Sequence, residues 1–235
     1  MSPAAARKLR THYGGTFDPV HVGHLAIARA ARDELDAPVH LMPAADPPHR
    51  SAPGANARQR VAMLELAIDG EAGLTIDQRE LSRAGPSYSV ETLRELRREY
   101  GSGTALALLL GADSFLSLPT WYHWRELLQL AHLIVADRPG SSLDDGLSAD
   151  LTEAVEGRWR AEPEALTAAP AGYVFRLRQP LQLESATGIR DAIAADSASW
   201  RQWVPATVAD YIVAHGLYGA ASSTPSSGAG GDISR

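Results

Sequence analysis

Two histidines stand three residues apart, shortly after a pair of glycines near the start of the chain. The stretch is GGTFDPVHVGH, in which Gly14 and Gly15 end a strand pattern and His21 and His24 begin a helical one. A spacing of three puts both imidazoles on one face of the first helical turn, where unpaired backbone amides already favour an anion. Because glycine lets the backbone approach a phosphate closely, the stretch predicts a cradle for phosphate oxygens.

Two other interpretations of this stretch stay open. The glycines could form a tight turn beside two incidental histidines, or the histidines could bind a metal ion. A metal site is disfavoured because no third ligand stands nearby, and the usual zinc helix motif spaces its histidines by four with a glutamate between them. The strand pattern before the glycines favours the cradle over the plain turn.

A second polar stretch, SATGIR, precedes a short helical pattern late in the chain. Ser185 and Thr187 could simply cap that helix, which is the usual role of hydroxyls at a helix start. Arg190 is less expected there, because the start of a helix disfavours a positive charge. An anion bound between these side chains would explain the placement, and a guanidinium can bind phosphate oxygens through two hydrogen bonds.

These residues must be positioned by a scaffold in which strand and helix patterns alternate. Such alternation predicts an α/β fold: a doubly wound, Rossmann-like parallel sheet with helices on both faces, which binds its ligands at the carboxyl ends of the strands. Strands are predicted at residues 9–13, 39–42, 74–77, 105–110, 132–136 and 173–177, and helices at residues 24–35, 56–68, 89–100, 121–131, 187–195 and 205–215.

We predict one domain over residues 9–218. Residues 141–171 are polar and helix-prone and interrupt the alternation, so we expect a surface excursion there. Residues 219–235 are small and polar with nothing to bury, which predicts a disordered tail.

The composition of the chain excludes several classes of function. The 235 residues carry a formal net charge of −6, which argues against nucleic acid as a partner because that would require a basic face. The chain contains no cysteine, so disulfides, thiolate metal sites and thiol catalysis are excluded. The longest aliphatic run, residues 105–110, is far too short to cross a membrane, and no secretory signal is evident. We therefore expect a cytoplasmic protein.

Together, GGTFDPVHVGH and SATGIR resemble the HxGH nucleotidyltransferases. Four further stretches make the chain similar to the bacterial nicotinate-mononucleotide adenylyltransferases over residues 9–218: PPHR at 47–50, PSYS at 86–89, GADS at 111–114 and PTWY at 119–122. The chain departs from the family pattern at Glu184, where the family often has isoleucine, and at Gly188, which is commonly larger and apolar.

The resemblance implies a reaction in which the 5′-phosphate of nicotinate mononucleotide attacks the α-phosphorus of ATP, giving deamido-NAD and pyrophosphate. It implies that His21, His24 and Arg190 contact the ATP phosphates, and that Mg²⁺ is carried on these phosphates. The nucleophile is already anionic, so catalysis must come from positioning and charge stabilisation. Further phosphate-binding groups implied by the resemblance are Gly14, Gly15, Thr16, Ser185 and Thr187.

For the acceptor, the resemblance implies that Asp113, after Gly111, contacts a ribose, although a helix cap would also explain this aspartate. Trp121 is implied to stack on the pyridine ring, although an isolated tryptophan is more often a core or surface residue. Backbone amides near Tyr88, Ser89 and Tyr122 would then receive the nicotinate carboxylate.

Pro47 and Pro48 stiffen a loop that could aim His49 and Arg50 at phosphate, although a solvated loop explains this pair nearly as well. Two alternatives to the implied reaction stay open. One is a sister enzyme that uses phosphopantetheine or a cytidylyl-transfer substrate. The other is a catalytically idle module that senses nucleotides. The sequence does not define the oligomeric state.

Overall fold

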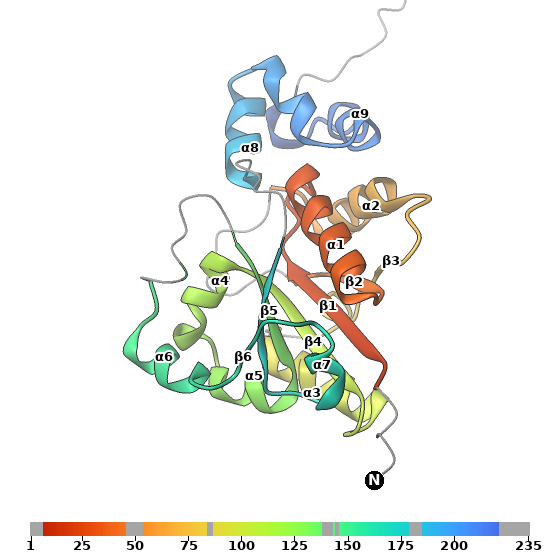
Figure 1. The fold of residues 1–235 in the computed structure, drawn as a ribbon. Coiled ribbons are helices and arrows are strands. Elements are labelled where there is room, and N and C mark those ends of the chain that lie inside the picture. Colours follow the sequence, from red (N-terminus) through yellow and green to blue (C-terminus); the bar gives the residue numbers. More distant parts are fainter. Residues whose placement is uncertain are drawn as a thin grey trace, which may run out of the picture.

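The computed structural model contains a parallel β-sheet with helices packed on both faces (Figure 1), which confirms the predicted fold class. The structure describes residues 7–45, 54–83, 87–137, 143, 146–178 and 185–220. In this part of the chain seven strands pair in the order β3-β2-β1-β4-β5-β7-β6, all of them parallel. They are β1 (Leu9–Gly15), β2 (Val39–Pro43), β3 (Leu74–Ile76), β4 (Ala105–Gly111), β5 (His132–Ala136), β6 (Trp159–Arg160) and β7 (Val174–Leu177).

The direction of the strand order reverses between β1 and β4, which are neighbours in the middle of the sheet. In sheets of this type, ligands bind at the carboxyl ends of the strands at such a switch point. The register pairs Tyr13 with Leu109. The loops that follow Gly15 and Gly111 therefore leave the sheet at the same edge, as a shared crevice requires.

The helices divide between the two faces of the sheet (Figure 1). One buried cluster includes residues of α1, α2, α8 and α9, and the other includes residues of α3, α4, α5 and α6. The α-helices are α1 (Val22–Leu35), α2 (Ala57–Ile68), α3 (Ser89–Tyr100), α4 (Ala112–Leu116), α5 (Trp124–Leu130), α6 (Ala149–Val155), α7 (Ala165–Ala168), α8 (Ala186–Ala194) and α9 (Ala206–Ala214). Three 3₁₀ turns span Leu118–Thr120, Ala198–Trp203 and Leu217–Gly219.

The central strand β4 is apolar at almost every position because both of its faces are covered. Ala105, Ala107 and Leu109 belong to the first buried cluster. The intervening Leu106 and Leu108 belong to the second. Because successive side chains of a strand point to opposite faces, a strand covered on both sides must be apolar at every position.

The cap predicted at Asn56 is confirmed. Its side chain accepts a hydrogen bond from the backbone N–H of Gln59, and the Gln59 side chain accepts one from the backbone N–H of Asn56, both at 3.0 Å. Gly216, predicted to end the last helix, follows α9 with a φ of +57°, a left-handed conformation common after helix ends.

The helix predicted at residues 121–131 is wrong at its start. Residues Leu118–Thr120 form a 3₁₀ turn, Trp121 has an extended backbone, and α5 begins only at Trp124. Two local features cause the delay. The Thr120 hydroxyl donates to the Ser117 carbonyl at 2.8 Å and closes the turn, and His123 adopts a left-handed φ of +50°.

The segment 141–171 is not only a surface excursion. Its described part contains α6, β6 and α7, and β6 extends the sheet beyond β7. Leu151 and Val155, four residues apart on α6, are buried in the second cluster, and Leu166 of α7 is buried in the first. The segment was expected to be peripheral because polar residues dominate it, but these few apolar side chains suffice to pack it against the domain.

Some predicted features fall outside the described residues, namely His49, Arg50 and residues 221–235. Gly219 and Ala220, which were included in the predicted tail, are described and are ordered. Gly219 belongs to a 3₁₀ turn, and the backbone N–H of Ala220 donates to the Leu217 carbonyl at 3.0 Å. Of the helices in the described residues, none is long and apolar enough to cross a membrane.

Candidate active site

The two histidines meet at the start of α1. His21 is the N-cap residue, and its Nδ1 accepts a hydrogen bond from the backbone N–H of Gly23 at 3.1 Å. The ring centroids of His21 and His24 lie 3.7 Å apart. Because Nδ1 of His21 accepts, the proton of the neutral ring is on Nε2. The structure thus brings both imidazoles to one helix start, with a ring N–H donor at the buried His21.

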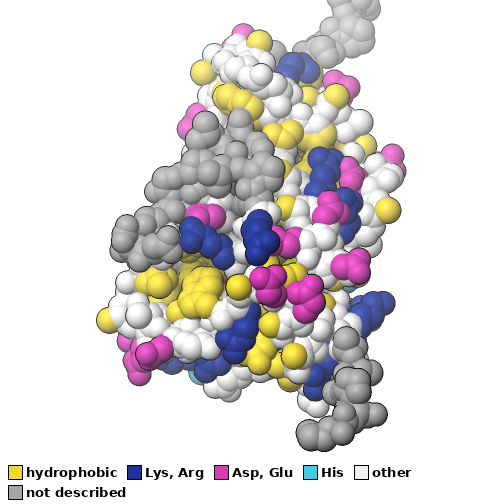
Figure 2. Space-filling view, in the orientation of Figure 1, with side chains coloured by type: hydrophobic (Ala, Val, Ile, Leu, Met, Phe, Trp, Pro, Cys, Tyr) yellow, Lys and Arg dark blue, Asp and Glu magenta, His cyan; other side chains and the backbone are white. Residues whose placement is uncertain are grey.

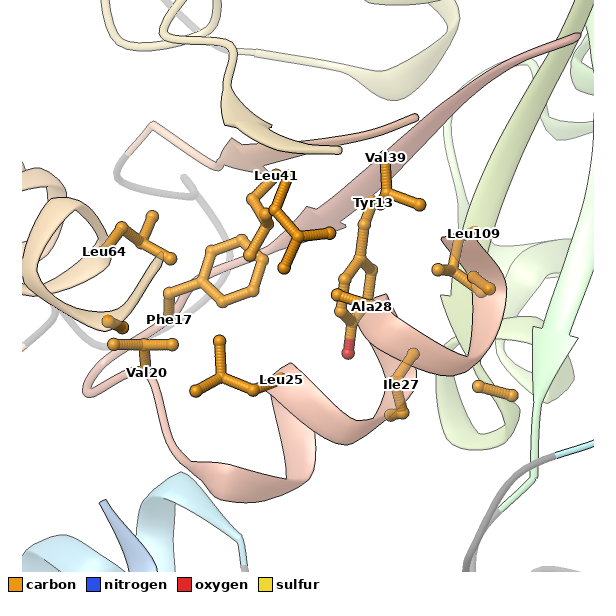
Figure 3. Close-up of a cluster of buried hydrophobic side chains, with 14 of the residues drawn as sticks. Tyr13, Phe17, Val20, Leu25, Ile27, Ala28, Val39, Leu41, Leu64 and Leu109 are labelled. Atoms are coloured by element: carbon orange, nitrogen blue, oxygen red, sulfur yellow. The ribbon is translucent and has the colours of Figure 1, made fainter. Parts of the chain in front are cut away.

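Buried aromatic rings hold the loop between β1 and α1, called the histidine loop below, in place. Figure 3 shows Phe17 pointing into the core between Leu41 and Leu64. A Cβ atom on Gly15 would lie only 3.0 Å from the Phe17 ring, so the glycine is needed for this close approach. The ring of His24 in turn contacts that of Phe17, with centroids 4.9 Å apart.

The second predicted stretch lies against this loop. Arg190 donates from Nη1 to the backbone carbonyl of Asp18 at 2.7 Å and from Nη2 to Thr187 Oγ1 at 3.1 Å. Ser185 caps α8, since its Oγ accepts from the backbone N–H of Gly188 at 3.1 Å. The capping interpretation therefore holds for Ser185, while the guanidinium of Arg190, about one third exposed at 32%, joins the histidine loop.

Two residues that sequence reasoning missed hold the same loop. Arg60 is fully buried and donates to the Thr16 carbonyl at 2.8 Å. Asp18 is 4% exposed, and its carboxylate accepts from the backbone N–H groups of Gly54 at 2.8 Å and Ala55 at 3.0 Å. The sequence pattern could have predicted the burial of Arg60, because this residue falls on the apolar face of α2 at helical spacing from Met63.

The loops after β4 and before α3 carry the predicted acceptor residues. Asp113 is exposed in the first turn of α4, which Gly111 caps. The rings of Tyr88 and Tyr122 contact each other in a tilted arrangement with centroids 4.7 Å apart, which brings the start of α3 to the turn after residues 118–120. Trp121 is partly buried and packs against the second buried cluster.

A polar network, also missed by sequence reasoning, joins Glu80 and Arg83 to the start of α3. Arg83 donates from Nη1 to Ser87 Oγ at 2.7 Å and from Nη2 to Glu95 Oε2 at 2.7 Å. The buried carboxyl group of Glu80 accepts from Thr92 Oγ1 at 2.8 Å, and burial raises the pKa of Glu80. The network ties the residues just before Tyr88 to the first turn of α3.

Comparison with known proteins identifies the class of enzyme and then the family. A model of the Cytidylyltransferase-like family matches residues 12–192, as expected for a nucleotidyltransferase. The probable nicotinate-nucleotide adenylyltransferase of Stenotrophomonas maltophilia is 57% identical over 215 residues, covering 89% of this chain and 96% of that protein. The protein of the same name from Xylella fastidiosa strain M12 is 48% identical over 215 residues, covering 90% and 96%. The chain therefore belongs to the nicotinate-nucleotide adenylyltransferase family.

A solved structure supports the fold. The chain is similar to Plasmodium falciparum nicotinic acid mononucleotide adenylyltransferase complexed with NaAD, with a TM-score of 0.67 at 16% identity, over 90% of this chain and 97% of that one. At this identity the likeness concerns the fold alone. The resemblance stated from the sequence motifs is confirmed by the curated relatives.

Proposed function

We propose that this enzyme transfers the adenylyl group of ATP to nicotinate mononucleotide, giving deamido-NAD and pyrophosphate. The observation that carries the proposal is the convergence of His21, His24 and Arg190 on the loop between β1 and α1. The attacking 5′-phosphate is already an anion, so the site needs no strong general base. Imidazole N–H groups and a guanidinium would stabilise the charge that develops on the α-phosphorus and the departing pyrophosphate.

The residues divide by role in this proposal. His21, His24 and Arg190 act on the phosphates of ATP. The backbone and hydroxyl groups that support phosphate binding are Gly14, Gly15, Thr16, Ser185 and Thr187, and His49 with Arg50 could add positive charge. On the acceptor side, Gly111 and Asp113 bind a ribose, Trp121 stacks on the pyridine ring, and the backbone near Tyr88, Ser89 and Tyr122 receives the carboxylate.

A divalent cation fits this site as part of the substrate. In the described residues no group of three or more histidine, aspartate or glutamate side chains could hold a metal ion. The carboxylate of Asp18 accepts from backbone N–H groups instead. Mg²⁺ carried on the ATP phosphates would neutralise part of their charge, and it usually keeps several waters and few protein ligands.

We also propose that the enzyme is cytoplasmic, where both substrates are available, and that it does not bind nucleic acid. On the face drawn in Figure 2, the basic side chains of the described residues lie interspersed with acidic ones. Nucleic-acid binding would require a continuous basic patch.

Pyrophosphate release from ATP tests the proposed reaction. We expect release with nicotinate mononucleotide and none with phosphopantetheine or without an acceptor. Release with phosphopantetheine alone would favour a sister enzyme. Binding of ATP without release on any acceptor would favour a nucleotide-sensing module, and either result would contradict the proposal.

A further inference from the structure

The last described turn of the chain reaches back to the histidine loop. Tyr218 lies in the 3₁₀ turn Leu217–Gly219, and its hydroxyl donates to Asp18 Oδ1 at 2.7 Å across 200 positions of sequence. Its backbone has a φ of +58°, a left-handed conformation that residues other than glycine rarely adopt. Contacts with the rest of the fold must hold the backbone in this conformation, which indicates that they determine the position of the Tyr218 side chain.

The ring of Tyr218 is fixed as closely as its hydroxyl. A Cβ atom on Gly54 would lie 2.8 Å from two carbons of the Tyr218 ring and 3.6 Å from Cδ of Arg190. The backbone at Gly54 therefore packs directly against the ring, and its N–H donates to Asp18 Oδ2 at 2.8 Å. The tyrosine, the carboxylate and the arginine thus form one contact cluster with the chain segment before α2.

Besides these neutral donors, the carboxylate of Asp18 has a cation close to it. Nη1 of Arg190 is 3.7 Å from Asp18 Oδ2, yet its hydrogen bond at 2.7 Å goes to the Asp18 backbone carbonyl. Oδ1 accepts from Tyr218 and from the backbone N–H of Ala55 at 3.0 Å. If the hydroxyl were lost, Oδ1 would keep only the bond from Ala55, and the carboxylate would gain a charge-assisted hydrogen bond by turning towards the guanidinium.

We propose that Tyr218 is a positioning residue that keeps the ion pair between Asp18 and Arg190 from closing into a direct hydrogen bond, so that the guanidinium remains available to the triphosphate. This inference rests on the proposed function, in which Arg190 binds ATP phosphates. Burial, followed by the negative charge of Asp18, raises the pKa of Tyr218 well above its ordinary value. The hydroxyl therefore stays protonated and continues to donate throughout the working pH range.

The variant Tyr218→Phe tests the proposal because it removes the hydroxyl and keeps the ring. We expect KM for ATP, and Kd for a non-hydrolysable ATP analogue measured by calorimetry, to rise about tenfold. KM for nicotinate mononucleotide should stay within about twofold of wild type. Tyr211→Phe is the matched control in α9, because its ring stacks on His215 with centroids 3.9 Å apart, remote from Asp18 in the contacts described. It should leave all of these constants unchanged.

A double-mutant comparison tests the route through Asp18. In an Asp18→Asn background, Tyr218→Phe should change KM for ATP by no more than about twofold, because the charge it restrains is gone. Gly54→Ala provides a second approach if Tyr218→Phe folds poorly, since it displaces the ring and should raise KM for ATP in the same selective way.

Three results would overturn the proposal: an unchanged KM for ATP in Tyr218→Phe, equal losses for both substrates, or an undiminished effect in the Asp18→Asn background. A wild-type enzyme that binds the ATP analogue but does not use nicotinate mononucleotide would contradict the proposed acceptor alone. The analogue titration requires no acceptor, so it would still decide the role of Tyr218.

Discussion

The two sides of the candidate site are held together in different ways. On the phosphate side, Arg60 reaches Thr16 across 44 positions of sequence, and Arg190 reaches Asp18 across 172. On the acceptor side, Arg83 reaches Ser87 across four positions, and Thr92 reaches Glu80 across 12. Long-range hydrogen bonds fix the histidine loop from several elements at once, whereas the hydrogen bonds around Arg83 join neighbours in sequence and only the ring contact of Tyr88 with Tyr122 adds longer-range support.

This difference has a physical reason in the chemistry proposed. Charge stabilisation at the α-phosphorus requires donors held in place before the reaction, because reorganising them would cost part of their effect. Contacts from distant elements provide that rigidity, since the loop can move only if several packed elements move together. The acceptor only has to be bound and aligned, and a locally supported turn is sufficient for that.

The largest effect is expected for His24→Ala. Loss of one preorganised donor from the phosphate side should lower kcat by at least about 100-fold, with the melting temperature close to that of wild type. The control is His215→Ala, because His215 is exposed at the end of α9 and should be replaceable within about twofold. Near-normal turnover by a folded His24→Ala enzyme would remove the histidine pair from the mechanism.

Acceptor preference should follow as the next largest effect. We expect kcat/KM for nicotinate mononucleotide to exceed that for the nicotinamide form at least about tenfold, because backbone N–H groups form charge-assisted bonds with a carboxylate. The amide would leave a donor unpaired, at a cost of about 1–3 kcal/mol, or about 5- to 150-fold. Trp121→Ala should weaken both acceptors and preserve much of their ratio. Equal efficiencies on the wild-type enzyme would contradict nicotinate recognition but not adenylyl transfer.

Local sequence patterns were sufficient for every strand of the described sheet except β6, but not for the contacts that support the two sides of the site. The apolar run 105–110 predicted a strand covered on both faces because every position must then be apolar, and β4 confirms it. The roles of Asp18 and Tyr218 could not be predicted in this way, since 200 positions separate them and neither belongs to a periodic pattern that marks the contact. Trp121 was misplaced in a helix because a left-handed residue, His123, is invisible to periodicity.

A smaller effect is expected when the locally supported turn is weakened. Arg83→Gln removes the charged donor to Ser87 and Glu95, so Ser87 and the neighbouring Tyr88 should be less firmly held. KM for nicotinate mononucleotide should rise about fivefold, on the order of 1 kcal/mol, with KM for ATP unchanged. Arg98→Gln, an exposed position on α3, is the control. A larger change for ATP than for the acceptor would show that the two sides are not supported separately.

The smallest effect on activity is expected at His132, where long-range contacts serve stability and not the site. Its Nε2 bonds with the Ala169 carbonyl at 3.0 Å, and its Nδ1 accepts from the backbone N–H of Tyr173 at 3.1 Å, across 37 and 41 positions. The ring is therefore neutral, with its proton on Nε2. Burial lowers the pKa of His132 to about 4, and the positive charge of Arg97 adds to the decrease.

The lowered pKa of His132 determines how the stability of the protein changes with pH. Between about pH 4 and the ordinary histidine pKa of 6.5, the unfolded chain binds a proton at His132 that the folded chain does not. The free energy of unfolding should therefore fall as the pH is lowered through this window, by up to about 3 kcal/mol from this residue. His132→Gln should be less stable at neutral pH but lose less stability on acidification, with both KM values within about twofold of wild type. Denaturant unfolding at several pH values measures both effects. An unchanged pH dependence would contradict the buried neutral ring, and a selective rise in KM for ATP would show that long-range contacts far from the histidine loop also control the phosphate side.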